Sequence, residues 1–448
     1  MRAEALSVIE FANPGAVESH SRGRNTGSKA IVVLFAPLQA GMAMPVALYL
    51  ATLTIMLFRP PEVEFYSVDR IALLVLVFVV VLRALALRQP LRVTGWLLFP
   101  MTALTVLASV STLSYSYQTS AWSVMAAKFV VPLAMFWMAT MTFRTESSLR
   151  WLERFCLAIL VYLSFTAIMS VAGIRQLVFP PYILDESLGI HADRARGPFL
   201  QAVANGVTLN MLGLLAIQGY CRRQLRGIWS LALLPLSVAI VATKTRAVWL
   251  SFAVSVMWLL LRKRKVRLRS AWGLLAVAGI IGAIFVSNVG ETFGSFEDRL
   301  RDGDSIEFRM AAYRAGWEMF SARPITGWGT TELQAGLADR IRGFRGESFA
   351  VHNTYLEILL EHGIFGIGLY GWLVVELFRL RKKRPGDLNG VASLRSVWPL
   401  LLCVYLVNAI FVVMNYPFVN GLLFTFAGIL AAKADPVQWK GAGAHPSV

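Results

Sequence analysis

Two short basic segments of this chain lie where apolar runs begin, and their side chains suit phosphate binding. Arg194 and Arg196 come just before an apolar run that starts at Phe199, and Lys244 and Arg246 occupy the very short turn between two further runs. Charged groups at the edge of a bilayer are costly and usually functional. Because a guanidinium can bind two phosphate oxygens at once and stays charged at physiological pH, these segments indicate an anionic ligand.

Three more residues complete a set that could act on a diphosphate. Lys128 lies within an apolar run, about two helical turns from its start, Arg309 lies in a long polar segment, and His352 ends that segment. Histidine can accept or donate a proton near neutral pH. Structural roles are open for each residue. Lys128 could extend outward to water, Arg309 could lie on a solvated helix face beside Glu307 or Glu318, and His352 could cap a helix end.

The sequence predicts neither a metal site nor a cofactor. No group of Asp, Glu and His has metal-ligand spacing, and Cys156, Cys221 and Cys403 occur singly in or beside apolar runs. Arginines would then neutralise a leaving diphosphate in place of a divalent cation. The predicted catalytic residues are His352 and Arg246, and the predicted diphosphate-binding residues are Arg194, Arg196, Arg246, Arg309 and Lys128.

The apolar runs that position these residues predict an all-α polytopic membrane protein. The chain of 448 residues is 56% hydrophobic and 15% charged, against about 45–50% and 25% in soluble proteins. Runs of about 17–28 residues are long enough to cross a hydrocarbon core of about 30 Å. The twelve predicted spans are 31–58, 69–87, 93–113, 121–142, 151–172, 199–218, 228–243, 245–261, 271–289, 363–380, 397–413 and 416–432.

The net charge of +17 predicts an orientation in the membrane rather than a nucleic-acid partner. If the polar tail 1–29 is cytoplasmic, the basic clusters at 222–226, 262–265 and 379–384 all fall on the cytoplasmic side. This is the asymmetry that the positive-inside rule requires. Both termini, including the tail 433–448, are therefore predicted to be cytoplasmic, with spans one to nine in 30–289 and the last three in 363–432.

Residues 290–362 are predicted to form an external, periplasmic loop, which contains the long polar segment, and the entry of the next helix. Asp304 and Glu307 resemble a capping box, and an apolar stripe at helical spacing follows. The stripe consists of Ile306, Met310, Tyr313, Trp317 and Phe320. We expect an amphipathic helix, ended by Pro324, whose stripe lies on the membrane surface or on the other spans.

The order of these residues resembles the signature of the O-antigen ligase and polymerase superfamily. The motifs are Arg194-x2-Gly197-Pro198-Phe199, Thr243-Lys244-Thr245-Arg246, Ser305-x3-Arg309-x7-Trp317-x6-Pro324-x2-Gly327-x-Gly329, and His352-Asn353-x-Tyr355-Leu356-x6-Gly363-Ile364-x-Gly366. The resemblance implies a metal-independent glycosyltransferase of the bacterial inner membrane. Such an enzyme transfers or polymerises glycan from an undecaprenyl-diphosphate-linked donor at the periplasmic face.

The acceptor stays open at this point, because ligases and polymerases share these motifs. It would be lipid A core, as in lipopolysaccharide biosynthesis, or the growing glycan itself, as in exopolysaccharide biosynthesis. By position, Arg194 or Arg196 and Arg246 would match the family's diphosphate-binding arginines, and His352 its essential histidine. The partners expected are the lipid-linked donor, the acceptor, membrane lipids and polysaccharide-export proteins. The alternative functions are a transporter of lipid-linked sugar or polysaccharide and a non-catalytic export-complex component.

Overall fold

The structure is a computed structural model that describes residues 45–59, 68–86, 95–114, 117–189, 191–222, 231–262, 304–341 and 351–432. These residues form helices and turns, and none of them lies in a β-strand. The predicted all-α fold is thereby confirmed for the part of the chain that is described. The predicted span 271–289 and both predicted tails lie outside it.

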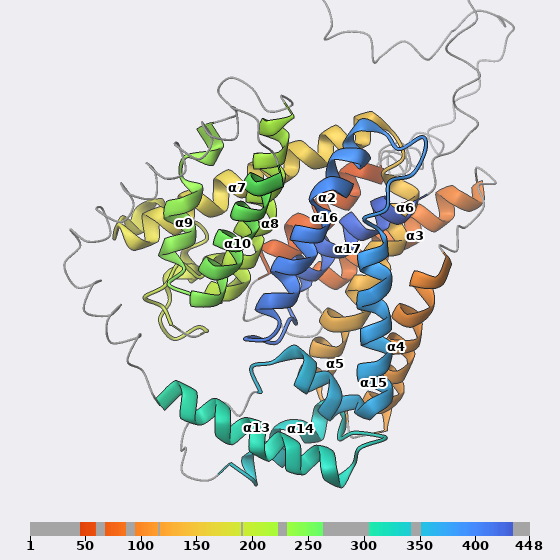
Figure 1. Ribbon diagram of the computed structural model, residues 1–448, viewed down its shortest axis with the longest axis vertical. Helices are drawn as coiled ribbons and strands as arrows, with labels where there is room; N and C mark the ends of the chain where they lie inside the picture. The colour runs from red at the N-terminus through yellow and green to blue at the C-terminus, as the bar shows by residue number, and fades with distance from the viewer. Residues whose placement is uncertain are drawn as a thin grey trace, which may run out of the picture. The chain divides into compact units, whose positions relative to one another are not determined.

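The helices follow one another with short connections over most of the described chain (Figure 1). The α-helices are α2 (Pro45–Leu57), α3 (Val68–Ala86), α4 (Gly95–Leu113), α5 (Thr119–Met125), α6 (Val131–Thr142), α7 (Glu146–Val171), α8 (Ala202–Cys221), α9 (Leu236–Ala242), α10 (Arg246–Arg262), α13 (Asp304–Ala322), α14 (Gly329–Ala338), α15 (Thr354–Arg379), α16 (Asn389–Asn408) and α17 (Pro417–Ala431). The π-helix η1 (Ala126–Val130) joins α5 to α6, and the short 3-10 helices are η2 (Arg175–Leu177), η3 (Pro181–Leu184) and η4 (Gly197–Phe199).

Six of the described helical segments are long and apolar enough to cross a membrane. They are Trp96–Leu113, Thr119–Thr142, Glu146–Val171, Ala202–Cys221, Thr354–Arg379 and Asn389–Asn408. Four shorter apolar helices coincide with the predicted spans 31–58, 228–243, 245–261 and 416–432. A multi-pass membrane protein is therefore confirmed, whereas the count of twelve spans stays a prediction.

Helix α17 lies at the centre of the hydrophobic core. Every residue from Phe418 to Ala431 is buried, as expected of a helix that is apolar on all sides. It packs on α6, α2, α16 and α8.

Helix α15 begins nine residues before the predicted start of its span, 363–380. Its first part, 354–362, which we call the half-helix, ends at Gly363, where the backbone leaves the helical region with φ 63°. The prediction placed the half-helix in the loop because the span was assigned by apolarity alone, and charged residues precede Gly363.

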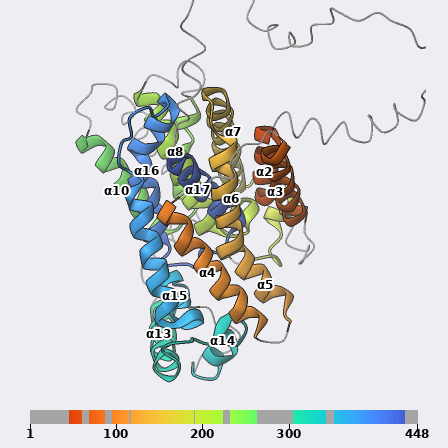
Figure 2. The same cartoon turned by 90° about the vertical axis from the view of Figure 1, so that its right-hand side faces the viewer.

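The break at Gly363 is filled by the turn 324–328 between α13 and α14. The N–H of Trp328 donates to the carbonyl oxygen of Leu360 at 2.8 Å, and the N–H of Ile364 donates to the carbonyl oxygen of Pro324 at 2.9 Å. Backbone groups in a bilayer must be satisfied within the protein. These two hydrogen bonds therefore allow the helix to break and also fix α13 and α14 to one end of α15, as Figure 2 shows.

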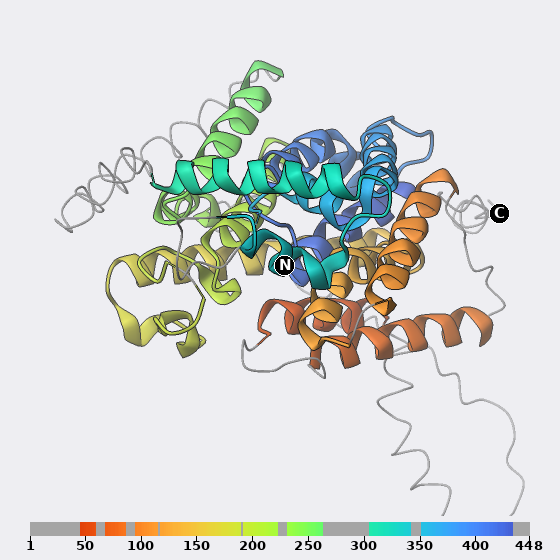
Figure 3. The ribbon, with the colours of Figure 1, turned by 90° about the horizontal axis from the view of Figure 1, so that it is seen from below.

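Helix α13 confirms that a helix follows Asp304, but its packed face differs from the predicted stripe. The face that packs on α14 and the half-helix consists of Phe308, Ala312, Ala315 and Met319. In the predicted stripe, Met310 is 49% exposed and Trp317 is 63% exposed, whereas Tyr313 and Phe320 are partly buried against this face. Figure 3, seen from this end, shows α13 running across the helix ends. Contact of the stripe with the membrane surface or with the other spans stays a prediction.

We predict that Gly363→Ala destabilises the protein more than other glycine changes in the same helix. A Cβ at Gly363 would overlap the carbonyl oxygen of Ile325, and the positive φ is itself unfavourable for alanine. The two effects together cost about 2–5 kcal/mol. The measurement is the thermal stability of the purified protein in detergent. Gly368→Ala is the matched control, because a Cβ there would meet no atom within 4 Å. Equal stability of the two variants would contradict the close packing of the turn 324–328 against Gly363.

Candidate functional site

The structure brings the first two basic segments together. The N–H of Ala195, between Arg194 and Arg196, donates to the carbonyl oxygen of Ala242 at the end of α9, at 3.0 Å. The side-chain amide of Asn205 donates to the carbonyl oxygen of Ala195 at 2.9 Å. The segment before α8 is thereby fixed beside the turn that leads into α10.

An ion pair adds to this junction. The Nζ of Lys244 lies 3.4 Å from the Oδ2 of Asp193. Lys244 also has a positive φ of 46°, a conformation that is unfavourable for a residue with a side chain and that clusters at functional sites.

Arg196 is a structural residue in this arrangement. Its side chain is buried, with 1% of the residue exposed, and its guanidinium donates to the carbonyl oxygens of Ile183, Asp185 and Leu188. The loop 183–189 is therefore wrapped around Arg196. Burial lowers the pKa of Arg196, and hydrogen bonds from Ser187 hold the pKa of Asp185 below its usual range.

Arg246 has a different environment. It is the first residue of α10 and is exposed. Within the described residues, its guanidinium makes no hydrogen bond or ion pair. Arg194 is half-buried one residue from the contact with Ala242. Of the two arginines before α8, Arg194 is thus more accessible to a ligand than Arg196.

The segment that carries His352 is fixed to the end of α16. His352 itself has a φ of 49°, and Asn353 caps the half-helix by accepting hydrogen bonds from the N–H groups of Tyr355 and Leu356. The N–H of Thr354 donates to the carbonyl oxygen of Ala409 at 2.8 Å. The rings of His352 and Phe308 lie 6.3 Å apart between centroids, so Arg309 is one residue from a contact with His352.

A buried polar seam connects the end of α16 with the start of α10. The side-chain amides of Asn408 and Asn210 donate to the hydroxyl of Ser251 at 3.0 and 3.1 Å. Ser251 lies five residues after Arg246, and Asn408 immediately precedes Ala409, to which Thr354 is bonded. The seam therefore puts the Arg246 and His352 segments at the same ends of neighbouring helices.

Lys128 lies in a buried charge cluster, which we define as Lys128, Glu357, Glu361 and His362. The Nζ of Lys128 donates to a carboxylate oxygen of Glu357 and to both carboxylate oxygens of Glu361, the latter at 3.0 Å. The side chain of Lys128 is 4% exposed, and those of Glu361 and His362 are fully buried. The Nε2 of His362 lies 3.8 Å from the Oε2 of Glu361.

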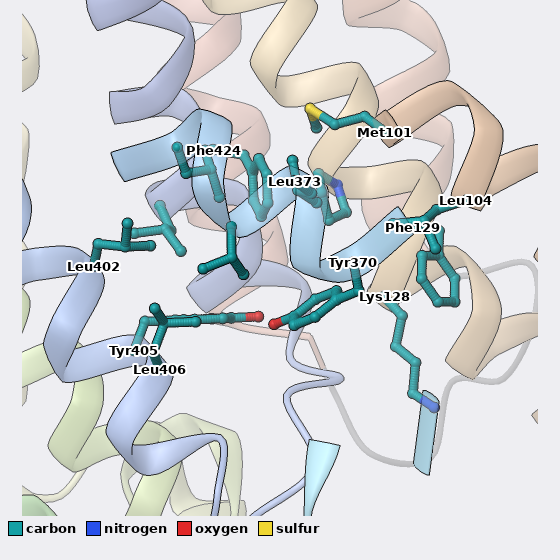
Figure 4. Close-up of a pocket in the computed structure, with 14 residues that line it drawn as sticks. Met101, Leu104, Lys128, Phe129, Tyr370, Leu373, Leu402, Tyr405, Leu406 and Phe424 are labelled. Atoms are coloured by element: carbon teal, nitrogen blue, oxygen red, sulfur yellow. The ribbon is translucent and has the colours of Figure 1, made fainter. Parts of the chain in front are cut away.

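The stem of Lys128 lies at the edge of a mostly apolar pocket whose lining includes Phe129, Tyr370, Leu373 and Tyr405. Figure 4 shows the ammonium group pointing away from this apolar lining. The lining of the pocket therefore does not bind the ammonium group, and the partners of that group are the two glutamates of the half-helix.

Sequence reasoning missed the partners of Lys128. Glu357 and Glu361 are four residues apart, which puts both carboxylates on one face of a helix. Two acids at this spacing inside a largely apolar stretch are the signal that could have found them. Lys128 also lies in the π-helix η1, and π-helical turns are frequent at functional sites. Among the residues that the structure describes, no group of three His, Cys, Asp or Glu could hold a metal ion.

The comparisons with known proteins bear on these segments. Residues 231–371 match the family described as O-antigen ligase. The matched part includes α9, α10, α13, α14 and the half-helix, and therefore Arg246, Arg309 and His352. Comparison of the chain with curated proteins gives no match. The family match supports the resemblance to the O-antigen ligase superfamily over residues 231–371.

Proposed function

We propose that this protein is a glycosyltransferase of the bacterial inner membrane that acts on lipid-linked glycan at the periplasmic face. The donor is a glycan on undecaprenyl diphosphate, and the acceptor is a hydroxyl group of lipid A core or of a growing glycan. One observation carries the proposal: the structure joins the three segments that contain Arg194, Arg246 and His352. The Arg194 segment is bonded to the end of α9, next to Arg246. The polar seam of Asn210, Ser251 and Asn408 then links the start of α10 to the end of α16, where the His352 segment is fixed. The family match over 231–371 supports the proposal.

In the proposed reaction the acceptor oxygen forms a bond to the anomeric carbon of the donor, and the bond from that carbon to the diphosphate breaks. His352 takes the proton of the acceptor hydroxyl. The electron pair of the broken bond stays on the diphosphate, whose charge Arg246 and Arg194 stabilise through bidentate hydrogen bonds, with Arg309 beside His352. No metal ion is required for this charge balance.

Lys128 and Arg196 have a supporting role in this proposal. The ammonium of Lys128 is bonded to two carboxylates, and the guanidinium of Arg196 is bonded to three carbonyl oxygens. Phosphate could bind either group only by displacing these partners. We therefore assign phosphate binding to the exposed and half-buried arginines.

A transporter is the second candidate, and one observation favours it. Helix α15 is interrupted at Gly363, and α5 and α6 are joined by a π-helix. Interrupted helices with charged residues are common in transporters of small ions and solutes. Transport of the lipid-linked glycan without transfer would therefore be the result that replaces the enzyme proposal.

The sidedness can be tested with reporter fusions. We expect a periplasmic reporter to be active when fused at Ala335 and a cytoplasmic reporter to be active when fused at Lys263, because the basic clusters should stay in the cytoplasm. Reporter activity is compared with the amount of each fusion in the membrane. The opposite pattern at the two positions would exclude a periplasmic site.

The reaction can be tested with purified protein and undecaprenyl-diphosphate glycan, with and without lipid A core, in the presence of a chelator. Product that requires lipid A core indicates a ligase, and a ladder of lipid-linked products indicates a polymerase. We expect Arg246→Gln and His352→Gln each to lower the transfer rate about 100-fold or more, because charge stabilisation and proton transfer each contribute at least that much. Arg314→Gln, an exposed residue of α13, is the control, and full activity of both site variants would reject the assigned roles.

Arg196→Gln should have a different effect from Arg246→Gln. Loss of the guanidinium leaves the carbonyl oxygen of the buried Ile183 without its donor, at a cost of about 1–3 kcal/mol. It also removes the hydrogen bonds that hold Asp185 and Leu188. We expect less protein in the membrane and a lower melting temperature for Arg196→Gln, with neither change in Arg314→Gln at an exposed position of α13. Normal stability of Arg196→Gln together with lost transfer would instead make Arg196 a ligand of the diphosphate.

A further inference from the structure

The buried charge cluster carries one negative charge too many for its surroundings. With Lys128 protonated, Glu357 and Glu361 ionised and His362 neutral, its net charge is −1. The side chains are between 0 and 11% exposed. An uncompensated buried ion costs several kcal/mol, about the same order as the whole stability of many domains.

Among the residues that the structure describes, the neighbouring elements do not supply the missing positive charge. Helices α4, α6 and α17, which pack on η1, contain no ionisable side chain. Tyr416, at the start of α17, interacts with Glu357 but is a neutral phenol. On α13 and α14, which pack on the half-helix, Arg314 is exposed and Arg323 pairs with Glu332. Arg309 is half-buried, Arg340 donates to the carbonyl oxygen of Gly336, and neither forms an ion pair with the cluster. Arg395 of α16 pairs with Asp387.

His362 indicates that the cluster has room for one more proton. Its side chain is fully buried, and among the described residues neither of its ring nitrogens has a hydrogen-bond partner. The Nε2 faces Glu361 at 3.8 Å. A proton between these groups would neutralise the cluster and give a buried polar atom a partner, which such atoms almost always have.

We propose that the buried charge cluster is a proton-binding site, which holds one exchangeable proton in addition to those of Lys128. The proton is shared by the two carboxyl groups, with His362 as the adjacent acceptor. The ligand is the proton itself, because the ammonium of Lys128 fills the position between the carboxylates that a metal ion would need. The site does not depend on the proposed glycosyl transfer, and its test needs no substrate.

Loss of the proton would change the charge of the half-helix, because both glutamates of the cluster lie in its turns. Glu357 lies in the first turn after the Asn353 cap, and His352 immediately precedes that cap. When the proton leaves, a full negative charge remains within the half-helix that carries His352. Because Glu357 lies only five residues after His352 in the chain, the charge of the cluster is expected to influence the surroundings of His352.

Infrared spectroscopy of the full-length protein in lipid nanodiscs tests the proposal directly. We expect wild-type protein at neutral pH to show the carbonyl stretch of a protonated carboxyl group, which shifts in D2O. Glu357→Gln and Glu361→Gln should each abolish this band, because either change leaves one carboxylate against one ammonium. Persistence of the band in either variant would show that the protonated carboxyl group does not depend on the charge balance of the pair, which would contradict a proton held by the cluster.

Lys128→Met should change the intensity of the carboxyl band in the opposite direction. Without the ammonium, two protons are needed for neutrality, so the band should roughly double in intensity. Glu332→Gln, which removes an exposed glutamate paired with Arg323, should leave the band unchanged. Titration of the wild-type band to high pH needs no variant and covers the case in which a variant does not fold.

Nuclear magnetic resonance of ¹⁵N-histidine-labelled protein completes the test. An imidazolium signal that is lost in His362→Phe would place the shared proton on His362 and would support the proton site. The proposal fails if wild-type protein shows neither a protonated carboxyl nor an imidazolium assigned to His362. It also fails if the carboxyl band persists in either glutamine variant.

Discussion

The arrangement of the candidate site depends on one constraint, that backbone groups freed inside a bilayer must find partners in the protein. Helix α15 can break at Gly363 only because the turn 324–328 supplies a donor to Leu360 and an acceptor to Ile364. The same two hydrogen bonds fix α13 and α14 to the half-helix. Once the half-helix is fixed at this end, its other end must also be held, and Thr354 bonded to Ala409 holds it there. His352 lies two residues before the attachment at Thr354, so its position follows from how the half-helix is held.

The sequence predicted the elements better than it predicted their contacts. Apolar runs indicate most of the described helices, since hydrophobicity is a local property of the chain. The half-helix was assigned to a loop because Glu357 and Glu361 make it look polar, and their compensation by Lys128 comes from a residue more than two hundred positions away. Helix α13 has two apolar faces, one through Met310 and Trp317 and one through Ala312 and Met319. Tertiary packing decides which of the two is buried. The nearness of Ala195 to Ala242 likewise follows from tertiary structure.

The break in α15 is compatible with an enzyme and with a transporter, but its details favour an enzyme. In transporters the unwound backbone carbonyls coordinate the transported ion or face a cavity. Here the carbonyl oxygen of Leu360 already accepts a hydrogen bond from Trp328, and Ile325 lies against Gly363. The break is therefore filled by the protein itself and has a structural purpose, which is to orient the half-helix. A rigidly held histidine suits catalysis, because catalytic groups must be kept close to the productive geometry.

The ammonium of Lys128 and the guanidinium of Arg246 differ in what each can still bind. The ammonium of Lys128 has three donors, and the structure gives it three carboxylate oxygens, one from Glu357 and two from Glu361. It has no further donor for a phosphate, and a phosphate that displaced a carboxylate would leave that carboxylate buried and unpaired. A guanidinium has five donors in a fixed fork and is less strongly hydrated than an ammonium. Arg246, at the exposed start of α10, can therefore present a complete fork to a diphosphate without breaking any contact among the described residues, which supports its proposed role in anion recognition.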